Sequence, residues 1–221
     1  MFHGSGLPSR TPSHVVTLRR VEPWFPGREE GRARVGWKPV THTVRTATRA
    51  DLQAISETHG AAFEDDPVAR WLVGESRSTS ARIGRLYRAV ADGHLPDGLS
   101  LMTQSAESVA IWAAPGHYKV PLRRLLPHAT GAFGALGVGG VGRLISIAKV
   151  EKLHPHEPHY YLASLGTRPA DEGKGFASAA LTPVLEQADS EGTGCFLESS
   201  KEHNVAFYAR HGFEVTGTHD L

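Results

Sequence analysis

The stretch SLGTRPADEGKGFASAAL, residues 164–181, decides the fold. Residues 159–166 (HYYLASLG) are rich in β-favouring side chains, and a glycine-containing turn separates them from a run of small and apolar residues. We predict a strand over 159–166 and a helix from Lys174 to about Ser190. A strand, a tight turn and a helix in this order are typical of an α/β unit.

The flanking segments continue the same alternation. GCFLESS (194–200) predicts a strand, EHNVAFYARH (202–211) a helix and FEVTGT (213–218) a further strand. Upstream, residues 41–48 alternate like a strand, and the segments 99–104 and 108–115 predict a hairpin. Amphipathic helices are expected between them, so we predict an α/β domain whose central mixed sheet is flanked by helices in three layers.

The composition sets limits on function. The chain has 221 residues, 40% of them hydrophobic, which suits one globular domain. Its net charge is +1, and residues 1–40 alone carry seven Lys/Arg against three Glu, so the remainder is slightly acidic. An acidic body has no footprint for nucleic acid. No apolar run of about 18 residues exists to span a membrane, and the single cysteine, Cys195, fits a reducing, cytoplasmic location.

Residues 1–40 differ from the rest of the chain. They are dense in Pro, Gly and Arg, as in LPSRTPSH, and sustain no strand or helix period. We predict a disordered basic extension over residues 1–40 and a folded domain over 43–221. Recruitment of a partner by the basic residues is the alternative.

The glycine pair in the turn matches neither common nucleotide fingerprint. The triphosphate loop G-x-x-x-x-G-K-[ST] needs a glycine where Arg168 stands and a hydroxyl where Gly175 stands. The dinucleotide pattern G-x-G-x-x-G has Ser178 at its third glycine. The backbone N–H groups of residues 173–177 still open a helix N-terminus, which attracts a pyrophosphate. An ordinary glycine-rich turn remains the alternative from spacing alone.

Two motifs together resemble a known family. LGTRPADEGKGFASAAL is similar to the acyl-CoA-binding motif [QR]-x-x-G-x-[GA] of the GNAT N-acetyltransferases, and NVAFYARHGFEV is similar to the helix and strand that follow it. The strand ending LESS and the proline Pro183 within the helix resemble most the branch that contains puromycin N-acetyltransferase. The resemblance covers about residue 43 to the C-terminus and is weak over 116–157.

The resemblance implies an enzyme that transfers acetyl from acetyl-CoA to a primary amine, as a monomer or homodimer without metal. The acceptor is expected to be a small, antibiotic-like amine. The alternatives are a protein amine as acceptor, and a CoA-binding module without transferase activity. The implied CoA contacts come from the strand end, the turn and the next helix: Leu165, Gly166, Thr167, Glu172, Gly173, Lys174, Gly175, Phe176, Ala177 and Asn204.

Tyr208 and Glu198 are the candidate catalytic residues. The resemblance implies that Tyr208 protonates the departing thiolate, and Glu198, at a strand end, is a candidate base for the amine. A carboxylate that only fixes local backbone is the alternative for Glu198. In the segment 61–72, Phe63, Asp66 and Trp71 are candidate acceptor contacts, with ordinary helix packing as the alternative.

Three features depart from simple expectations. Glu172 stands where the family has Gln or Arg, and its charge repels a pyrophosphate unless it points to solvent; Lys174 and Arg168 are candidates to compensate. The family's final strand, inserted beside the one matching 194–200, has no counterpart after residue 218. The histidines of HPHEPH (154–159) are separated by prolines, which favours a loop over a metal site.

Overall fold

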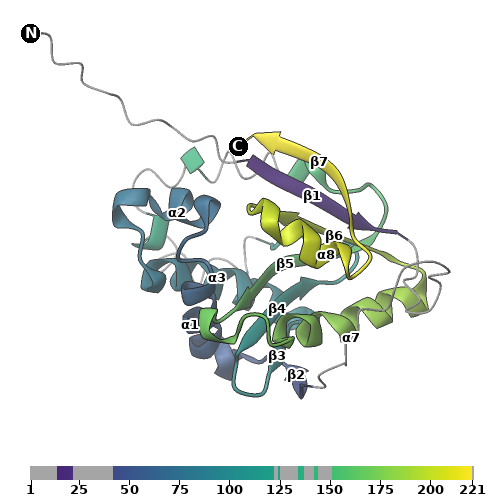
Figure 1. Ribbon diagram of the computed structural model, residues 1–221, viewed down its shortest axis with the longest axis horizontal. Helices are drawn as coiled ribbons and strands as arrows, with labels where there is room; N and C mark the ends of the chain where they lie inside the picture. The colour runs from purple at the N-terminus through teal and green to yellow at the C-terminus, as the bar shows by residue number, and fades with distance from the viewer. Residues whose placement is uncertain are drawn as a thin grey trace, which may run out of the picture.

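One mixed sheet of seven strands organises the molecule, in the order β2-β3-β4-β5-β6-β1-β7 (Figure 1). The computed structural model describes residues 14–21, 42–121, 124, 134–136, 142–143 and 151–220. Neighbouring strands are antiparallel except β5 and β6, which are parallel. The strands are β1 (His14–Arg20), β2 (Val44–Thr46), β3 (Leu101–Thr103), β4 (Ser108–Ala113), β5 (His159–Thr167), β6 (Gly194–Ser199) and β7 (Glu214–Asp220).

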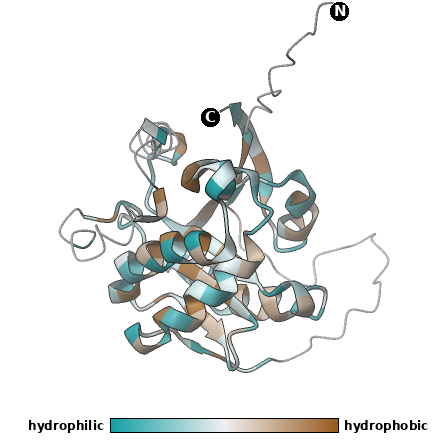
Figure 2. Ribbon diagram, turned by 90° about the vertical axis from the view of Figure 1, so that its left-hand side faces the viewer, coloured by the Kyte–Doolittle hydropathy of each residue, from teal (hydrophilic) through white to brown (hydrophobic). Residues whose placement is uncertain are grey.

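Helices cover both faces of this sheet. The longer ones are α1 (Leu52–Ala62), α3 (Ser80–His94) and α7 (Phe176–Glu191), and the shorter ones are α2 (Pro67–Val73) and α8 (Val205–Ala209). Successive residues of β4 divide between two cores, because side chains alternate across a strand. Val109 and Ile111 pack with α1, whereas Ala110 and Trp112 pack with α7. The predicted three-layer α/β class is confirmed, and Figure 2 shows that the helices carry both hydrophilic and hydrophobic residues.

Two glycines allow α1 and α3 to approach closely. A Cβ at Gly84 would collide with the carbonyl oxygen of Ser56, and one at Gly60 would collide with that of Ser80. The helix pair therefore needs glycine at both contacts, and it gives the sheet a rigid support on this face.

The N-terminal strand β1 corrects the predicted domain boundary. It lies between β6 and β7 and pairs antiparallel with both (Figure 1). It thus takes the position that the resemblance gives to a strand following residue 218. Leu18 is fully buried in the core, and Arg20 donates to Asp189 of α7 at 2.6 Å. Disorder over 1–40 is therefore wrong for residues 14–20, because β1 closes the sheet between two otherwise unpaired edges.

The other predicted elements lie close to their expected positions. The hairpin β3–β4, the helix α7 and the strands β5, β6 and β7 agree within about two residues at most ends, and α7 continues through Pro183. The strand expected over 41–48 is shorter, at Val44–Thr46. Residues 1–13, 22–41 and most of 122–150 lie outside the described part of the chain. No helix among the described residues is both long and apolar enough to cross a bilayer.

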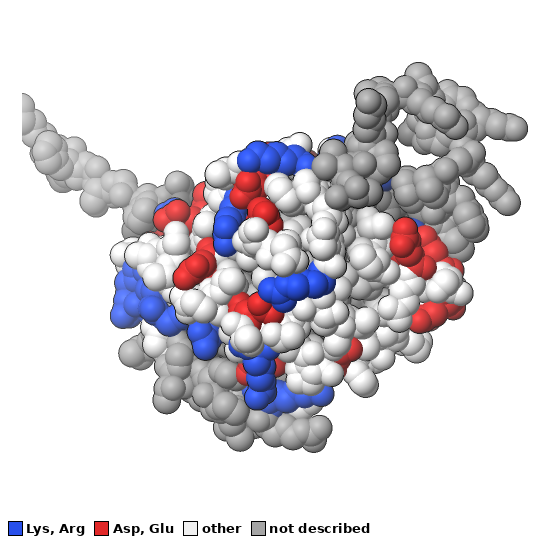
Figure 3. Space-filling model, turned by 90° about the horizontal axis from the view of Figure 1, so that it is seen from below, with Lys and Arg blue, Asp and Glu red and all other residues white. Residues whose placement is uncertain are grey.

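The surface charges are mixed. On the face shown in Figure 3, Lys and Arg side chains are interspersed with Asp and Glu among the described residues. Several of these charges are paired across short distances, such as Arg45 with Asp51 at 2.6 Å and Lys174 with Asp171 at 2.9 Å. The guanidinium of Arg45, which hydrogen-bonds to Asp51, holds the pKa of Asp51 well below its ordinary value.

Candidate active site

The site begins where β5 and β6 separate. The two parallel strands pair only over His159–Leu162 and Gly194–Leu197. At that point β5 contains an unmatched residue, Ala163, opposite the step from Ile111 to Trp112 in β4. Such a β-bulge bends its strand. β5 then continues to Thr167 beside β4, and its other edge is left without strand pairing from β6.

A cavity of about 920 Å³ lies at this separation. Three groups of residues surround it. One comes from β5 and the loop before α7, one from the end of β6 with α8, and one from α1, α2 and α3 on the opposite side. The predicted residues that line it are Leu165, Thr167, Glu172, Gly173, Gly175, Phe176, Ala177, Glu198, Asn204 and Tyr208.

The loop before α7 presents its backbone to the cavity. Gly173 (φ 73°) and Gly175 (φ 89°) both adopt the left-handed conformation that favours glycine. α7 starts at Phe176, so the N–H groups of its first turn have no partner within the helix. His211, two residues past the end of α8, contacts Ser178 through Nε2 and Oγ at 3.0 Å, which holds α8 against this turn. The arrangement is a concave anion site at a helix N-terminus.

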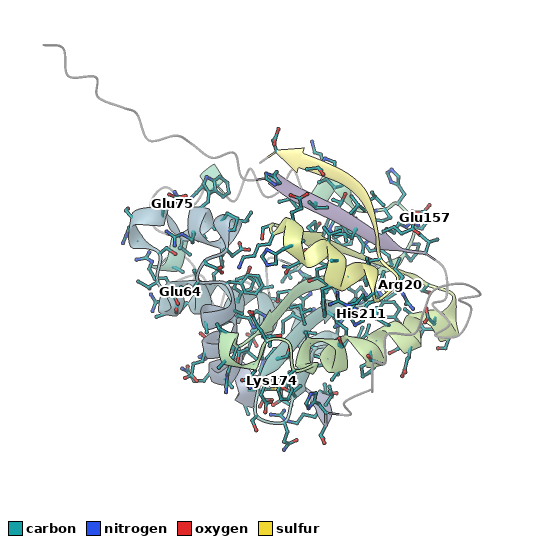
Figure 4. The ribbon with its side chains drawn as sticks, in the orientation of Figure 1. Arg20, Glu64, Glu75, Glu157, Lys174 and His211 are labelled. Atoms are coloured by element: carbon teal, nitrogen blue, oxygen red, sulfur yellow. The ribbon has the colours of Figure 1, made fainter. Side chains whose placement is uncertain are left out.

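The charged side chains of this loop point elsewhere. Lys174, labelled in Figure 4, forms an ion pair with Asp171 at 2.9 Å and does not line the cavity. Arg168 Nε donates to Thr58 Oγ1 at 3.3 Å. Neither cation is therefore held beside the loop amides as compensation for Glu172. Glu172 is exposed, and its N–H contacts the Pro169 carbonyl at 3.4 Å, so the free N–H groups begin at Gly173.

Tyr208 lies at the boundary between core and cavity. It is on α8, with 7% of its surface exposed, and its ring packs edge-on against Phe207 and Phe213 at 5.2 and 5.9 Å. Burial raises the pKa of its phenol, so Tyr208 stays protonated at neutral pH. A protonated phenol at the cavity wall is a proton donor, as the resemblance implies. Phe207, the residue before Tyr208 in α8, lines the cavity as well.

Glu198 lies near the end of β6, with its side chain 11% exposed. Its Oε1 lies 3.2 Å from His154 Nε2. That oxygen is buried and receives no aligned hydrogen bond from the described residues, so the contact is of the ion-pair kind. β1 supports this position, because Thr17 stands opposite Glu198 in the β1–β6 register.

The opposite wall is aromatic and apolar. Phe63 stacks on Tyr87 at 4.3 Å, and both line the cavity. Asp66, 2% exposed, caps α2 by accepting from the Ala69 N–H at 2.8 Å and also accepts from Ser200 Oγ. This carboxylate therefore ties α2 to the end of β6. Of the three predicted contacts in 61–72, Phe63 and Asp66 line the cavity, and Trp71 does not.

A buried histidine supports β5 from behind. His59 of α1 is fully buried, and its Nε2 contacts Ser164 Oγ at 3.0 Å. Burial lowers the pKa of His59 to about 4, so the ring is neutral at neutral pH. Gly166 faces the same helix, where a Cβ would lie 3.3 Å from Ala62 Cβ. Gly166 does not line the cavity, so its role as a CoA contact stays a prediction.

Sequence reasoning missed several cavity residues. His154, Tyr87 and Ser200 line the cavity, although the sequence analysis gave none of them a role in the site. Their approach depends on tertiary contacts between segments far apart in the chain. Only the histidine-rich HPHEPH segment gave a signal. Among the described residues, no group of three or more His, Cys, Asp or Glu is arranged to hold a metal ion.

The comparisons with known proteins agree with this arrangement. Residues 108–213 match the family model described as the acetyltransferase (GNAT) family. A curated relative, an uncharacterized N-acetyltransferase of Schizosaccharomyces pombe, is 24% identical over 174 residues, covering 74% of this chain and 70% of the relative.

A solved structure shares the fold, and a second one has a lower similarity. The crystal structure of histone acetyltransferase HPA2 and related acetyltransferase from Corynebacterium glutamicum has a TM-score of 0.55 and 23% identity, covering 78% of this chain and 84% of that one. A GNAT family acetyltransferase from Brucella melitensis, in complex with acetyl-CoA, has a TM-score of 0.43 and 16% identity, covering 81% and 90%. None of these relatives bears the puromycin name, so that branch stays a prediction. The family model over residues 108–213 and the curated relative show that this chain is similar to GNAT acetyltransferases, and the Corynebacterium structure shows that it shares their fold.

Proposed function

We propose that this protein is an N-acetyltransferase that moves acetyl from acetyl-CoA to the primary amine of a small molecule. One observation carries the proposal. A single cavity joins an unpaired β5 edge, a helix N-terminus with free N–H groups, a protonated phenol at Tyr208 and a carboxylate at Glu198. These are the groups that binding an extended thioester and deprotonating an amine require.

The β5 edge and the loop suit the two ends of acetyl-CoA. Backbone groups of residues 163–167 would pair with the pantetheine amides, as an added strand does. The N–H groups of residues 173–177 would receive the pyrophosphate at the positive end of α7. Because Glu172 is exposed, its carboxylate is screened by solvent and weakens this binding only slightly.

Glu198 serves as the base. An amine enters as an ammonium ion, and Glu198 accepts one proton from it to free the nitrogen lone pair. The nitrogen then bonds to the thioester carbonyl carbon, and the C–S bond breaks. Positioning the two reactants in one cavity supplies much of the rate enhancement.

Tyr208 serves as the acid. Its phenol donates a proton to the departing sulfur, and the surplus proton on the new amide nitrogen restores the phenol. One proton per turnover therefore remains on Glu198 and must leave the site. Burial favours the neutral phenol, which keeps the donor loaded before each turnover.

The aromatic wall indicates the kind of acceptor. Phe63, Tyr87 and Leu86 present apolar surface to the cavity, so we propose an amine with an apolar or aromatic body, such as the antibiotic-like amines of the puromycin branch. A flexible, charged lysine side chain matches this wall poorly.

An amine panel tests the proposal. Purified protein with acetyl-CoA is given aromatic and aliphatic amines and a lysine-containing peptide, and free thiol is measured. Release with aromatic amines supports the proposal, and release with the peptide alone shifts it to a protein acceptor. Binding of acetyl-CoA without thiol release from any amine would leave a CoA-binding module.

A further inference from the structure

A chain of nitrogen and oxygen contacts leads away from the base. His154 Nε2 lies 3.2 Å from Glu198 Oε1, and His154 Nδ1 lies 3.0 Å from His159 Nε2. His159 Nδ1 in turn lies 2.8 Å from the backbone carbonyl of Glu157. Both rings belong to the HPHEPH segment (154–159), to which the proposed acetyl transfer assigns no role.

The backbone carbonyl fixes the proton positions along this chain. A carbonyl oxygen only accepts, so His159 must donate from Nδ1. Burial lowers the pKa of His159, so this ring is neutral and its Nε2 carries a lone pair. His154 then donates from Nδ1 to His159, which leaves His154 Nε2 facing Glu198 Oε1. Two lone pairs at this distance would repel, so the pair carries one proton, and the 3.2 Å approach is then an ion-pair contact rather than an aligned hydrogen bond.

The surroundings hold the His154 ring in this orientation. Its side chain is 4% exposed, Tyr118 stacks on it at 4.1 Å, and the rings of Tyr161 and Phe196 approach at 4.6 and 4.7 Å. The phenols of Tyr118 and Tyr161 are the titratable groups that contact the ring besides Glu198 and His159.

At the far end of this series of contacts, Arg19 faces Glu157, the residue whose carbonyl accepts from His159. Arg19 of β1 lies 3.4 Å from the carboxylate of Glu157 (labelled in Figure 4). Both cavities also meet at the ring, because His154 and Tyr118 line the main cavity and a second cavity of about 540 Å³. His156, Lys119 and Lys152 are the remaining charged or titratable residues on that second side.

We propose that His154 is a positioning residue for Glu198: it shares one proton with the carboxylate, and His159 and the Glu157 carbonyl set its tautomer. With that proton on the imidazole, Glu198 is a carboxylate aimed into the cavity and ready to accept the proton of the ammonium substrate. The inference rests on the proposed function, since it assigns His154 a part in the same acetyl transfer.

The variant His154→Gln tests the role. The glutamine amide is still a hydrogen-bond donor, but it cannot take up the extra proton that the imidazole of His154 shares with Glu198. We therefore expect kcat/KM for the amine to fall about 10-fold or more, with unchanged acetyl-CoA affinity. The loss should appear in kcat rather than in the KM for the amine, because His154 acts on the base and not on amine binding. His156→Gln is the matched control, since His156 is exposed on the same segment and takes no part in the series of contacts from Glu198 through His154 to His159. A purely packing role for His154 would disturb the cavity wall and raise the KM for the amine as well as lower the rate.

A double variant sharpens the test. A residue that acts through Glu198 adds nothing once Glu198 is gone, so His154→Gln/Glu198→Gln should be as slow as Glu198→Gln alone. A further drop, multiplying the two single effects, would overturn the proposal.

A measurement without turnover separates this inference from the proposed function. Nitrogen-15 NMR of the imidazole rings distinguishes the two neutral tautomers and the doubly protonated ring. We expect His159 to carry its proton on Nδ1, and Glu198→Gln to change the protonation of His154 but not of His156. Unchanged His154 signals would refute the inference even if the enzyme is active. The expected signals in a protein that transfers no acetyl would instead refute the proposed function alone.

Discussion

The variant Leu18→Ala tests whether β1 is an integral strand. Leu18 is 0% exposed and packs in the core that also contains Val16, Leu181, Leu197 and Phe213. Replacing a buried leucine with alanine removes three carbon atoms and leaves a cavity, which costs about 2–5 kcal/mol. For a domain of this size, that loss lowers Tm by roughly 5–15 °C. The control Val21→Ala, one residue past β1 and 59% exposed, should change stability by less than about 0.5 kcal/mol.

Thermal and urea unfolding, each followed by circular dichroism, measure the difference between the two variants. Because β1 stands beside Glu198, Leu18→Ala should also reduce activity at temperatures just below its melting point. Equal stability of Leu18→Ala and Val21→Ala would show that residues 14–20 are not part of the folded sheet, and the reasoning about β1 would fail.

Four other changes have defined outcomes. Tyr208→Phe should lower kcat by about 10²–10⁴ with unchanged acetyl-CoA affinity, and full activity would remove Tyr208 from its role. Gly84→Ala should lower the free energy of unfolding by about 1–3 kcal/mol, because its Cβ overpacks α1 against α3. The control Gly134→Ala has open space around the new Cβ and should lower it little. Equal losses of stability in urea unfolding would contradict this. Glu172→Gln should tighten acetyl-CoA binding by no more than about threefold, because the carboxylate is exposed and screened, and calorimetry would detect a larger effect. The unfolded chain protonates His59 below about pH 6.5, whereas the folded chain does so only near its pKa of about 4. Acidification through this window should therefore lower the free energy of unfolding by about 3 kcal/mol in the wild type and by less in His59→Gln. Urea midpoints measured at several pH values would show the difference.

The sequence predicted the sheet and its helices because alternation and turn residues are local signals. The strand β5, the glycine turn and α7 follow from residues 159–190 alone. The segment HVVTLRR that forms β1 contains three adjacent β-favouring residues, but its Pro- and Gly-rich flanks hid that signal. Its place between β6 and β7 depends on pairing across about 180 residues of sequence, which no local pattern reveals.

The candidate site was predicted unevenly for the same reason. The family motifs put Tyr208, Glu198 and the turn glycines in one site, and the cavity brings them together. The compensation expected from Lys174 fails, because Asp171, three residues earlier, captures its charge. The contact of His154 with Glu198 depends on how the HPHEPH segment meets the end of β6, so the spacing of its histidines gave no hint of this pairing.

Binding of acetyl-CoA is the most direct test of the central claim. At a concentration 100 times its Kd, a ligand that binds only the folded state adds about 2.7 kcal/mol of stability, which raises Tm by roughly 5–10 °C here. We therefore predict a saturable rise in Tm with acetyl-CoA, a similar rise with CoA and a much smaller one with pantetheine, which lacks the pyrophosphate. No rise with acetyl-CoA at millimolar concentration would contradict the account.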